Sequence, residues 1–336
     1  MNPLKFIPIL KSVLWGGNKI TALKGMGEMD AKIGESWEIS DVPGHETLVA
    51  DGLYMNRTLT QLLSTHGAQI MGNDWVKRME EIPAGDPRRR FPLLIKIIDA
   101  ARDLSVQVHP NDELAWERHH SLGKTEMWYA MPDCDTNAHL RIGWKTLVTP
   151  DGYRKLLDDH TIADALRDIK CRPGDMFYLP AGRIHAICKG TMVAEIQETS
   201  DITYRIYDYD RRDANGQLRP LHTEESVDAI NYADVQADYH TYYDKEPNRR
   251  NVAVESPYFT TSVIQLNAAL NLSYADVDSF VILICTEGRV NLTTIDAEDG
   301  DDINTLRAGE TILLPATIQT LQLQPIGTAT LLEVRG

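Results

Sequence analysis

The 336-residue sequence predicts a mainly β protein with a few short helices in its N-terminal half. Short apolar or alternating runs, punctuated by glycine and proline, dominate the chain, as is typical of strands joined by turns. Helical periodicity is confined to a few places. A weak internal repeat predicts, in addition, that the chain contains the same β unit twice.

The strand predictions rest on short runs rich in β-branched and apolar residues. In the run LSVQVHPND (104–112), Gln107 and His109 point to the same face, because side chains along a strand alternate with a period of two. Two polar groups therefore occupy a face that would otherwise be core or cavity. Further strands are predicted in PLLIKIIDA (92–100), DMFYLPA (175–181), TMVAEIQETS (191–200) and RVNLTTI (289–295).

Helices are predicted where the apolar spacing changes and capping residues are present. Residues 58–67 have Thr58 as an N-cap and Gly67 as a stop. In residues 223–232, Thr223 can cap the helix, and the two glutamates that follow it meet the positive helix end. The remaining helical patterns cover 75–82, 111–123 and 149–168.

The internal repeat relates residues 171–187 to residues 306–322. Arginine, glycine, an acidic residue, leucine, proline and alanine recur at matching offsets. The second copy has Gln319 and Thr320 near the place of His185 in the first copy. Metal chemistry that depends on this histidine would therefore be missing from the C-terminal copy.

The segment 232–256 is polar and without clear periodicity, which is typical of a linker or surface excursion. We therefore predict two domains. Residues 1–235 form the metal-bearing catalytic domain with its short helices, and residues 236–336 form a second β domain that lacks metal ligands.

The composition disfavours several classes of partner. The formal net charge of -15 and the pI near 5.1 disfavour nucleic acid and anionic membrane surfaces, because the summed field repels polyanions. No apolar run reaches the roughly 18 residues of a membrane span, and the N-terminus lacks a signal-peptide pattern. We expect a cytoplasmic protein, with reduced thiols because its four cysteines show no C-x-x-C spacing.

Four residues are candidate metal ligands. A single histidine on a strand is usually structural, a strand carboxylate is usually solvated, and a strand amide is usually hydrogen-bonded. Together, however, they make a mixed nitrogen and oxygen set suited to Zn²⁺. The four residues are Gln107, His109, Glu126 and His185, and they come from at least three predicted strands.

Several ordered motifs carry a resemblance to a known family. FPLLIKIIDAARDLSVQVHPND spans residues 91–112, and it is followed by GKTEMWY, GDMFYLPAGRIHAI and SDITYRIYDYDR, with GESWEIS earlier in the chain. The sequence closely resembles type I mannose-6-phosphate isomerases in their short bacterial form, from about residue 4 to 232 and more loosely beyond. The resemblance implies two cupin (jelly-roll) β-barrels, one zinc ion per chain, and interconversion of mannose 6-phosphate and fructose 6-phosphate.

The resemblance also implies residue roles. It makes Gln107, His109, Glu126 and His185 the zinc ligands, and it points to Arg205 and Lys124 as catalytic residues. Arg211 stands where longer members have a lysine. Because a guanidinium is effectively never deprotonated, Arg211 is not expected to act as a base.

The reaction requires a proton to leave the carbon beside a carbonyl and return to the neighbouring carbon through an enediol, while zinc stabilises charge on oxygen. The proton carrier stays open between Lys124, a metal-bound water and Glu38. Trp37 is a candidate wall of the pocket. For the phosphate, Ser105, Lys96, Lys124 and Arg211 form the candidate set.

Two other functions remain open at this stage. Two histidines and a carboxylate can also hold Fe²⁺ for a cupin oxygenase, although a basic cluster is not needed there. A sugar-phosphate-binding cupin without turnover is the other alternative, because one fold hosts many activities. The expected partner is a small phosphorylated sugar, and the chain is expected to be a monomer or a homodimer.

Overall fold

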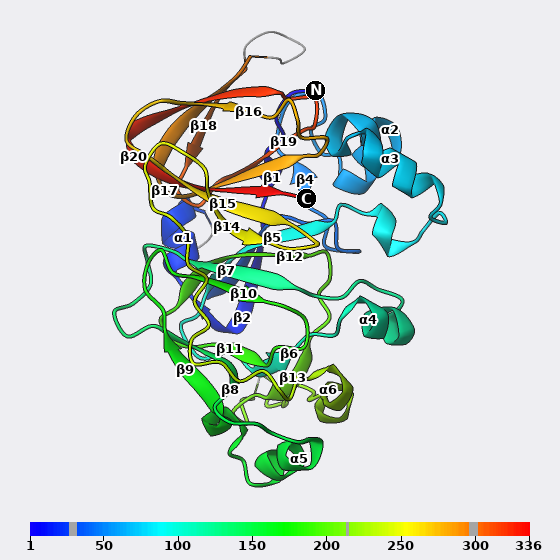
Figure 1. The fold of residues 1–336 in the computed structure, drawn as a ribbon, viewed down its shortest axis with the longest axis vertical. Coiled ribbons are helices and arrows are strands. Elements are labelled where there is room, and N and C mark those ends of the chain that lie inside the picture. Colours follow the sequence, from blue (N-terminus) through cyan, green and yellow to red (C-terminus); the bar gives the residue numbers. More distant parts are fainter. Residues whose placement is uncertain (27–31, 213–214, 296–301) are drawn as a thin grey trace.

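The computed structural model describes residues 1–26, 32–212, 215–295 and 302–336. Three antiparallel sheets form its framework, and a mainly β fold is thereby confirmed (Figure 1). The six-stranded sheet contains, in spatial order, β10 (Met176–Leu179), β7 (Glu126–Ala130), β12 (Met192–Glu198), β5 (Leu93–Asp99), β3 (Ile33–Ile39) and β2 (Ile9–Gly17). The five-stranded sheet contains β13 (Tyr204–Tyr207), β6 (Val106–Val108), β11 (His185–Ile187), β8 (His139–Trp144) and β9 (Leu166–Lys170).

The remaining strands form a C-terminal sheet and one short ribbon. The path of the C-terminal sheet is β14 (Asn251–Glu255), β15 (Thr260–Leu266), β20 (Thr320–Arg335), β17 (Val281–Thr294) and β18 (Asp302–Arg307). Off this path, β16 (Leu270–Ser273) pairs with β20, and β19 (Thr311–Leu314) pairs with β17. The ribbon consists of β1 (Phe6–Ile7) and β4 (Leu48–Val49).

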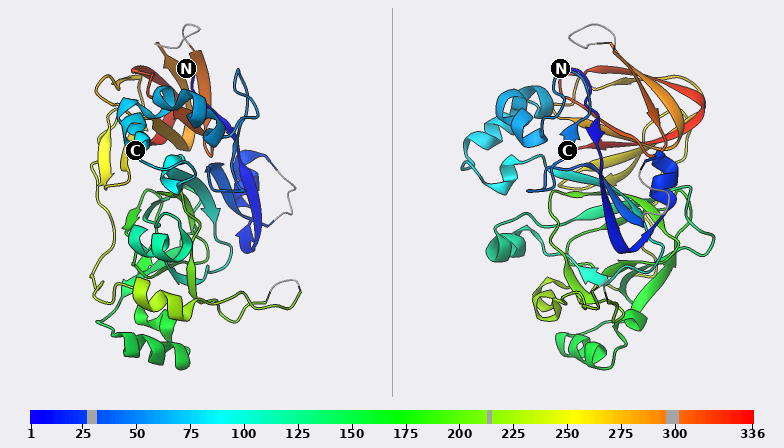
Figure 2. Two further views of the ribbon diagram at one scale, coloured as in Figure 1. Left: turned by 90° about the vertical axis from the view of Figure 1, so that its right-hand side faces the viewer. Right: turned by 180° about the vertical axis from the view of Figure 1, so that it is seen from behind.

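All helices within the described residues precede the C-terminal sheet in the chain. Figures 1 and 2 show α2 to α6 along one side of the molecule and α1 on the other. None of these helices combines the length and the apolar composition needed to cross a bilayer. Their bounds are α1 (Lys19–Lys24), α2 (Leu59–Met71), α3 (Asn73–Glu80), α4 (Asp112–His119), α5 (Pro150–Asp158) and α6 (Thr223–Ala229), with 3₁₀ turns η1 (Pro87–Arg89) and η2 (Ile162–Ala165).

The six-stranded sheet is buried on both faces, and this positions the functional site. Along β5, Ile95 and Ile97 belong to an apolar cluster shared with the C-terminal sheet, whereas Ile98 belongs to a second cluster that includes Leu140 of the five-stranded sheet. Lys96 lies between Ile95 and Ile97 in the strand, so its side chain points to the opposite face. That face is shared with Ile98 and is turned toward the five-stranded sheet. This explains how a lysine fits into such an apolar run.

Three helix predictions need correction. The helix predicted to stop at Gly67 extends to Met71, although its backbone is non-helical at His66, one residue before the predicted stop. The helix predicted over 149–168 ends at Asp158, and Leu166–Lys170 instead forms strand β9 against β8. Thr223 does not cap α6, whose N-cap position is His222.

Other local predictions are confirmed. Thr58 forms a capping box with Gln61 at the start of α2. The two copies of the repeat have the same local structure: Gly174 and Gly309 have φ angles of 84° and 83°, and each precedes a strand. The two-barrel description and the boundary near residue 235 stay predictions.

Candidate metal centre and active site

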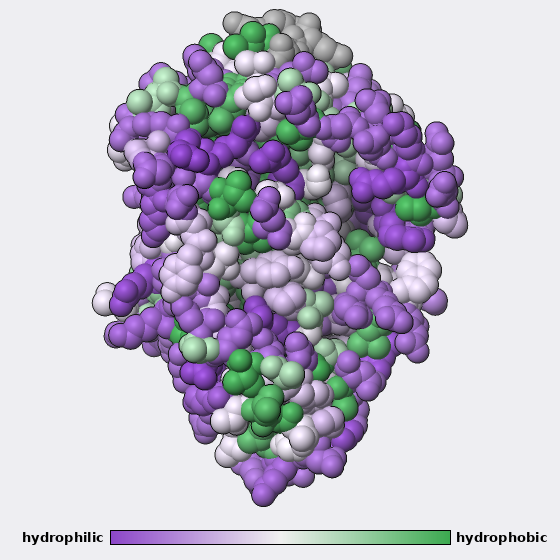
Figure 3. Space-filling view, in the orientation of Figure 1, coloured by the Kyte–Doolittle hydropathy of each residue, from purple (hydrophilic) through white to green (hydrophobic). Residues whose placement is uncertain are grey.

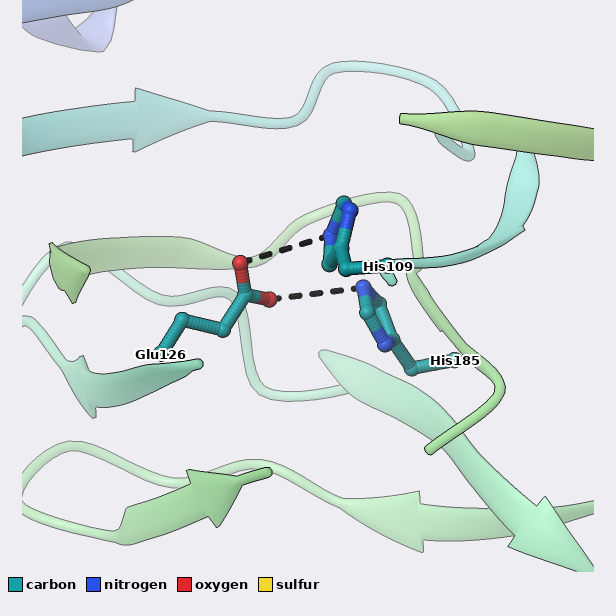
Figure 4. A group of neighbouring side chains, drawn as sticks. All are labelled: His109, Glu126 and His185. Carbon is teal, nitrogen blue, oxygen red and sulfur yellow. Dashed lines mark ion pairs between the residues drawn. The ribbon is translucent and has the colours of Figure 1, made fainter. Parts of the chain in front are cut away.

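The candidate ligands meet between the two N-terminal sheets. His185 begins β11 and pairs in register with Gln107 of β6, so the five-stranded sheet brings these two together. His109 follows β6 directly, and Glu126 begins β7 in the six-stranded sheet. Figure 4 shows both imidazole rings directed toward the Glu126 carboxylate.

The distances within this cluster are short. His185 Nε2 lies 3.3 Å from Glu126 Oε1, and His109 Nε2 lies 3.5 Å from Oε2 of the same carboxylate. One ligand atom from each of the three residues lies within 4.8 Å of the others. The Gln107 amide nitrogen is 3.3 Å from His185 Nε2. Tertiary structure therefore brings all four predicted ligands together.

Backbone contacts orient both histidines. His109 Nδ1 lies 2.9 Å from the carbonyl oxygen of Ile202, and His185 Nδ1 lies 2.9 Å from that of Arg183. Because a carbonyl accepts a hydrogen bond, each Nδ1 carries the proton and each Nε2 presents a lone pair to the cluster. Burial and Lys124 lower the pKa of both rings, to about 3 for His185, so both are neutral near pH 7.

Glu126 is fully buried and faces a mixture of charges. Burial raises the pKa of its carboxyl group to about 7, with Glu195 adding to the rise and Lys124 opposing it. The Lys124 ammonium contacts Oε2 of Glu126 and lies 3.1 Å from His109 Nε2. Among the described residues, Oε1 of Glu126 has no hydrogen-bond partner.

These residues fit a metal ion. The donors are two neutral imidazole nitrogens and one carboxylate, a set that Zn²⁺ and other divalent transition metals bind. Ligands about 2.1 Å from one ion at tetrahedral angles lie about 3.4 Å apart, which matches the observed nitrogen–oxygen distances. A buried carboxylate oxygen without a hydrogen-bond partner is costly unless a cation contacts it. The cluster of His109, Glu126 and His185 can therefore hold a metal ion.

A cavity of about 290 Å³ adjoins the cluster. Gln107 and Lys124 line this cavity and also contact His185 and His109 of the cluster. Arg205 lines it as well, and its buried Nε has no hydrogen-bond partner within the described part of the chain. Of the residues predicted for the substrate, Ser105, Lys96 and Trp37 line the cavity.

Glu38 and Arg211 do not line this cavity. Glu38 lies on the opposite face of β3 from Trp37, where Ser36 and Lys24 hydrogen-bond to its carboxylate at 2.5 and 2.9 Å. Glu35, which lies two residues before Trp37 in β3, lines the cavity instead. Two adjacent strand residues cannot share one face, and the packing of the sheets selects Glu35 and Trp37.

Arg211 is held away from the cavity by other contacts. Its guanidinium contacts the Asp208 carboxylate and the Asp103 carbonyl. Arg219 also contacts Asp208 and does line the cavity. The loop between β13 and α6 therefore supplies a cation that sequence reasoning missed, because nothing in its local pattern shows how the loop folds back.

Glu195 is a further residue that sequence reasoning missed. It lies opposite Lys96 in the β5–β12 ladder, 3.1 Å from the ammonium. Burial alone would raise the pKa of Glu195, but Lys96 and Lys124 hold it at about 2. The sequence did contain a signal for Glu195. Like Lys96, it is a charged residue inside an apolar strand run. The other missed lining residues include Lys11, Asp201, Thr203 and His222.

Comparisons with known proteins agree on one family. The family model for the catalytic domain of type I phosphomannose isomerase matches residues 4–138. The mannose-6-phosphate isomerase ManA of Bacillus subtilis is 34% identical over 326 residues, which is 96% of each chain. The mannose-6-phosphate isomerase of Streptococcus mutans is 32% identical and covers 92% of this chain and 91% of the relative. A crystal structure of the Bacillus subtilis mannose 6-phosphate isomerase matches with a TM-score of 0.85 at 32% identity, covering 99% of each chain.

Proposed function

Because this chain belongs to the type I phosphomannose isomerase family, we propose that it interconverts mannose 6-phosphate and fructose 6-phosphate in the cavity beside the His109–Glu126–His185 cluster. The convergence of this cluster with a cavity lined by cations is the observation that carries the proposal. An oxygenase or a sugar-phosphate-binding protein without turnover is not favoured by the family.

The proposed cofactor is one zinc ion per chain. His109, Glu126 and His185 would hold it, with Gln107 as the fourth candidate ligand. When bound, the ion would supply Lewis-acid stabilisation of negative charge on the sugar's carbonyl and hydroxyl oxygens. The carbonyl hydrogen bonds at both Nδ1 atoms keep the imidazoles in the tautomer that such binding needs.

The remaining cavity residues bind and orient the sugar phosphate. Arg205 keeps its charge at every accessible pH, and its unpartnered Nε is a ready donor to an anionic oxygen. Lys124, at the junction of cavity and cluster, donates to the reacting end of the sugar. Ser105 and Lys96 complete the set that we assign to the substrate, and Trp37 forms an apolar wall.

The isomerisation is a proton transfer between neighbouring carbons. In the forward direction the C2 proton leaves, an enediol forms, and a proton is added to C1 while the carbonyl moves to C2. Preorganised donors lower the barrier because they already face the oxygens that gain charge. Glu38 is removed from the candidates for the proton carrier, because its side chain lies on the other face of β3.

The test measures product and metal in the same sample. Purified protein is given mannose 6-phosphate, and fructose 6-phosphate is followed in a coupled assay before and after chelation, with elemental analysis alongside. We expect turnover with bound zinc, its loss with chelator and its return when Zn²⁺ is added back. Undiminished turnover by metal-free protein would refute the zinc assignment, and absence of fructose 6-phosphate from zinc-loaded protein would refute the isomerase. The cytoplasmic location and the monomer or homodimer state remain predictions.

A further inference from the structure

A second cavity, of about 730 Å³, shares no lining residue with the cavity beside the metal cluster. It lies where α3, α4 and the turn between β14 and β15 meet. Figure 1 shows these elements on the helical side of the molecule, and Figure 3 shows paler and green side chains among the purple ones on that side. Its volume falls within the range of roughly 300–1,000 Å³ that is typical of sites for small organic molecules.

Aromatic and aliphatic side chains form most of the wall. Trp75 and Met79 come from α3, Trp116 comes from α4, and Tyr258 and Phe280 come from the C-terminal half. One cation already lies over a ring here, because the Arg88 guanidinium carbon is 5.6 Å from the centroid of Trp116. The wall is therefore suited to an apolar ligand body and to a positive charge near an aromatic face.

The charges that remain at this cavity are mainly negative. Arg88 pairs with Asp86, and Arg90 lies 3.6 Å from Glu46, so partners outside the cavity offset both guanidiniums. The other charged lining side chains are Arg78, Asp112, Glu113 and Glu198. Asp112 and Glu113 outnumber the guanidinium of Arg78, and the buried Glu198 carboxyl group would ionise beside a bound cation, so the cavity favours a cationic ligand.

Glu198 is the most telling of these carboxyl groups. It is only 4% exposed, yet it lines the cavity beside Asp112, whose Oδ2 accepts a 3.0 Å hydrogen bond from Tyr258. Burial raises the pKa of Glu198 to about 8, and Asp112 adds to the rise. A ligand ammonium between these two carboxyl groups would lower the pKa of Glu198 and stabilise both groups in their ionised form.

The same two carboxyl groups hold the backbone that delivers two active-site side chains. Asp112 Oδ1 accepts a 2.8 Å hydrogen bond from the Gly123 amide, and Glu198 Oε1 accepts a 2.7 Å bond from the Thr125 amide. The Glu198 amide in turn donates to the Thr125 carbonyl. Lys124 lies between the anchored residues Gly123 and Thr125, and Glu126 follows Thr125. The segment 123–126 therefore connects the carboxyl groups of the second cavity to the metal cluster.

We propose that this cavity binds an organic ammonium ion with an aromatic body, and that its occupancy changes turnover at the metal-bearing cavity. The binding half stands on the second cavity alone, whereas the regulatory half rests on the proposed isomerase function. The ligand's ammonium contacts Asp112 and Glu198, and its ring packs among Trp75, Trp116 and Phe280.

Calorimetry with three matched probes tests the binding half. 2-Phenylethylamine carries the proposed charge, 2-phenylethanol is its neutral counterpart, and 3-phenylpropionate is anionic. We expect saturable binding of the amine only, weakened about tenfold by Glu198→Gln, the loss expected for one charge-assisted hydrogen bond. Glu117→Gln removes a carboxylate of α4 outside this cavity and should bind like wild type. Absence of saturable amine binding, equal binding of the neutral probe, or equal weakening by both variants would overturn the proposal.

Turnover of zinc-loaded protein tests the regulatory half. Saturating amine should change the rate of fructose 6-phosphate formation at least twofold in wild type and leave Trp116→Ala unaffected, with the basal rate of that variant unchanged. Binding without any effect on turnover would overturn the regulatory assignment. An inactive protein that still binds the amine would instead refute the proposed isomerase, so the two failures are distinguishable.

Discussion

The ammonium of Lys96 lies 3.1 Å from Oε1 of Glu195 across the β5–β12 ladder, and both side chains are buried. The other carboxylate oxygen of Glu195 accepts a 2.8 Å hydrogen bond from the Trp128 indole. Trp128 in turn meets the His185 ring edge to face, with centroids 5.2 Å apart. This ion pair therefore supports both the cavity wall and the metal cluster.

Removal of one partner from this pair should destabilise the fold. Glu195→Gln leaves the Lys96 ammonium without its nearest counter-charge, and we expect the free energy of unfolding to fall by about 3–5 kcal/mol. Urea denaturation measures the change. Glu255→Gln, on an exposed position of β14, serves as the control and should lie near wild type. The double variant Lys96→Met with Glu195→Leu should recover much of the stability but not the activity. A Glu195→Gln protein as stable as the control would contradict this role.

His185→Ala should release the metal while the fold is kept. The change removes one donor from the cluster, and the loss of metal affinity should exceed the roughly 10–100-fold effect of removing a group that only orients a ligand. Elemental analysis after gel filtration, with circular dichroism for the fold, measures this. His160→Asn is the matched control, because His160 is exposed and its positive φ of 56° suits asparagine. Full metal content in His185→Ala would exclude His185 as a ligand.

Arg205→Lys should slow turnover without loss of metal. Lysine keeps the charge but loses the planar set of donors, so we expect kcat/KM to fall by about 10–100-fold, the effect of one or two charge-assisted hydrogen bonds. Arg211→Lys is the comparison, because Arg211 contacts Asp208 and the Asp103 carbonyl rather than the cavity. Steady-state kinetics at matched zinc content should show the larger loss for Arg205→Lys. Equal losses would show that cavity position does not distinguish the two arginines.

Glu198 should make stability depend on pH. Its pKa is about 8 in the folded chain against an ordinary value of 4.5, chiefly because it is buried. Between these values the folded state binds a proton that the unfolded state releases, so the stability contributed by this group falls as pH rises from about 4.5 to about 8. The slope approaches about 1.4 kcal/mol per pH unit.

Urea midpoints of wild type and Glu198→Gln, compared from pH 5 to about 8.5, isolate this effect, because the other titrating groups are common to both proteins. Glutamine keeps an oxygen that can accept the Thr125 amide hydrogen bond. The difference between the two proteins should move in favour of Glu198→Gln as pH rises. A difference that stays constant over this range would show that Glu198 is ionised in the folded chain.

The local features of the fold were predictable from the chain itself. Thr58 carries its own capping signal, and Gly174 and Gly309 recur in equivalent turns. Prediction was wrong where distant packing decides the outcome. Leu166–Lys170 is a strand because β8 offers it a hydrogen-bonding edge, and no local propensity reports that edge.

The sequence by itself determined the chemistry of the site: the residue types at 107, 109, 126 and 185, and the shared face of Gln107 and His109 that follows from strand alternation. Tertiary structure alone decided which face of each strand meets the cavity, and so chose Glu35 over Glu38 and Arg219 over Arg211. It also paired Glu195 with Lys96. The physical reason is that alternation fixes only which residues share a face, whereas the direction of that face depends on how sheets and loops from distant parts of the chain pack together.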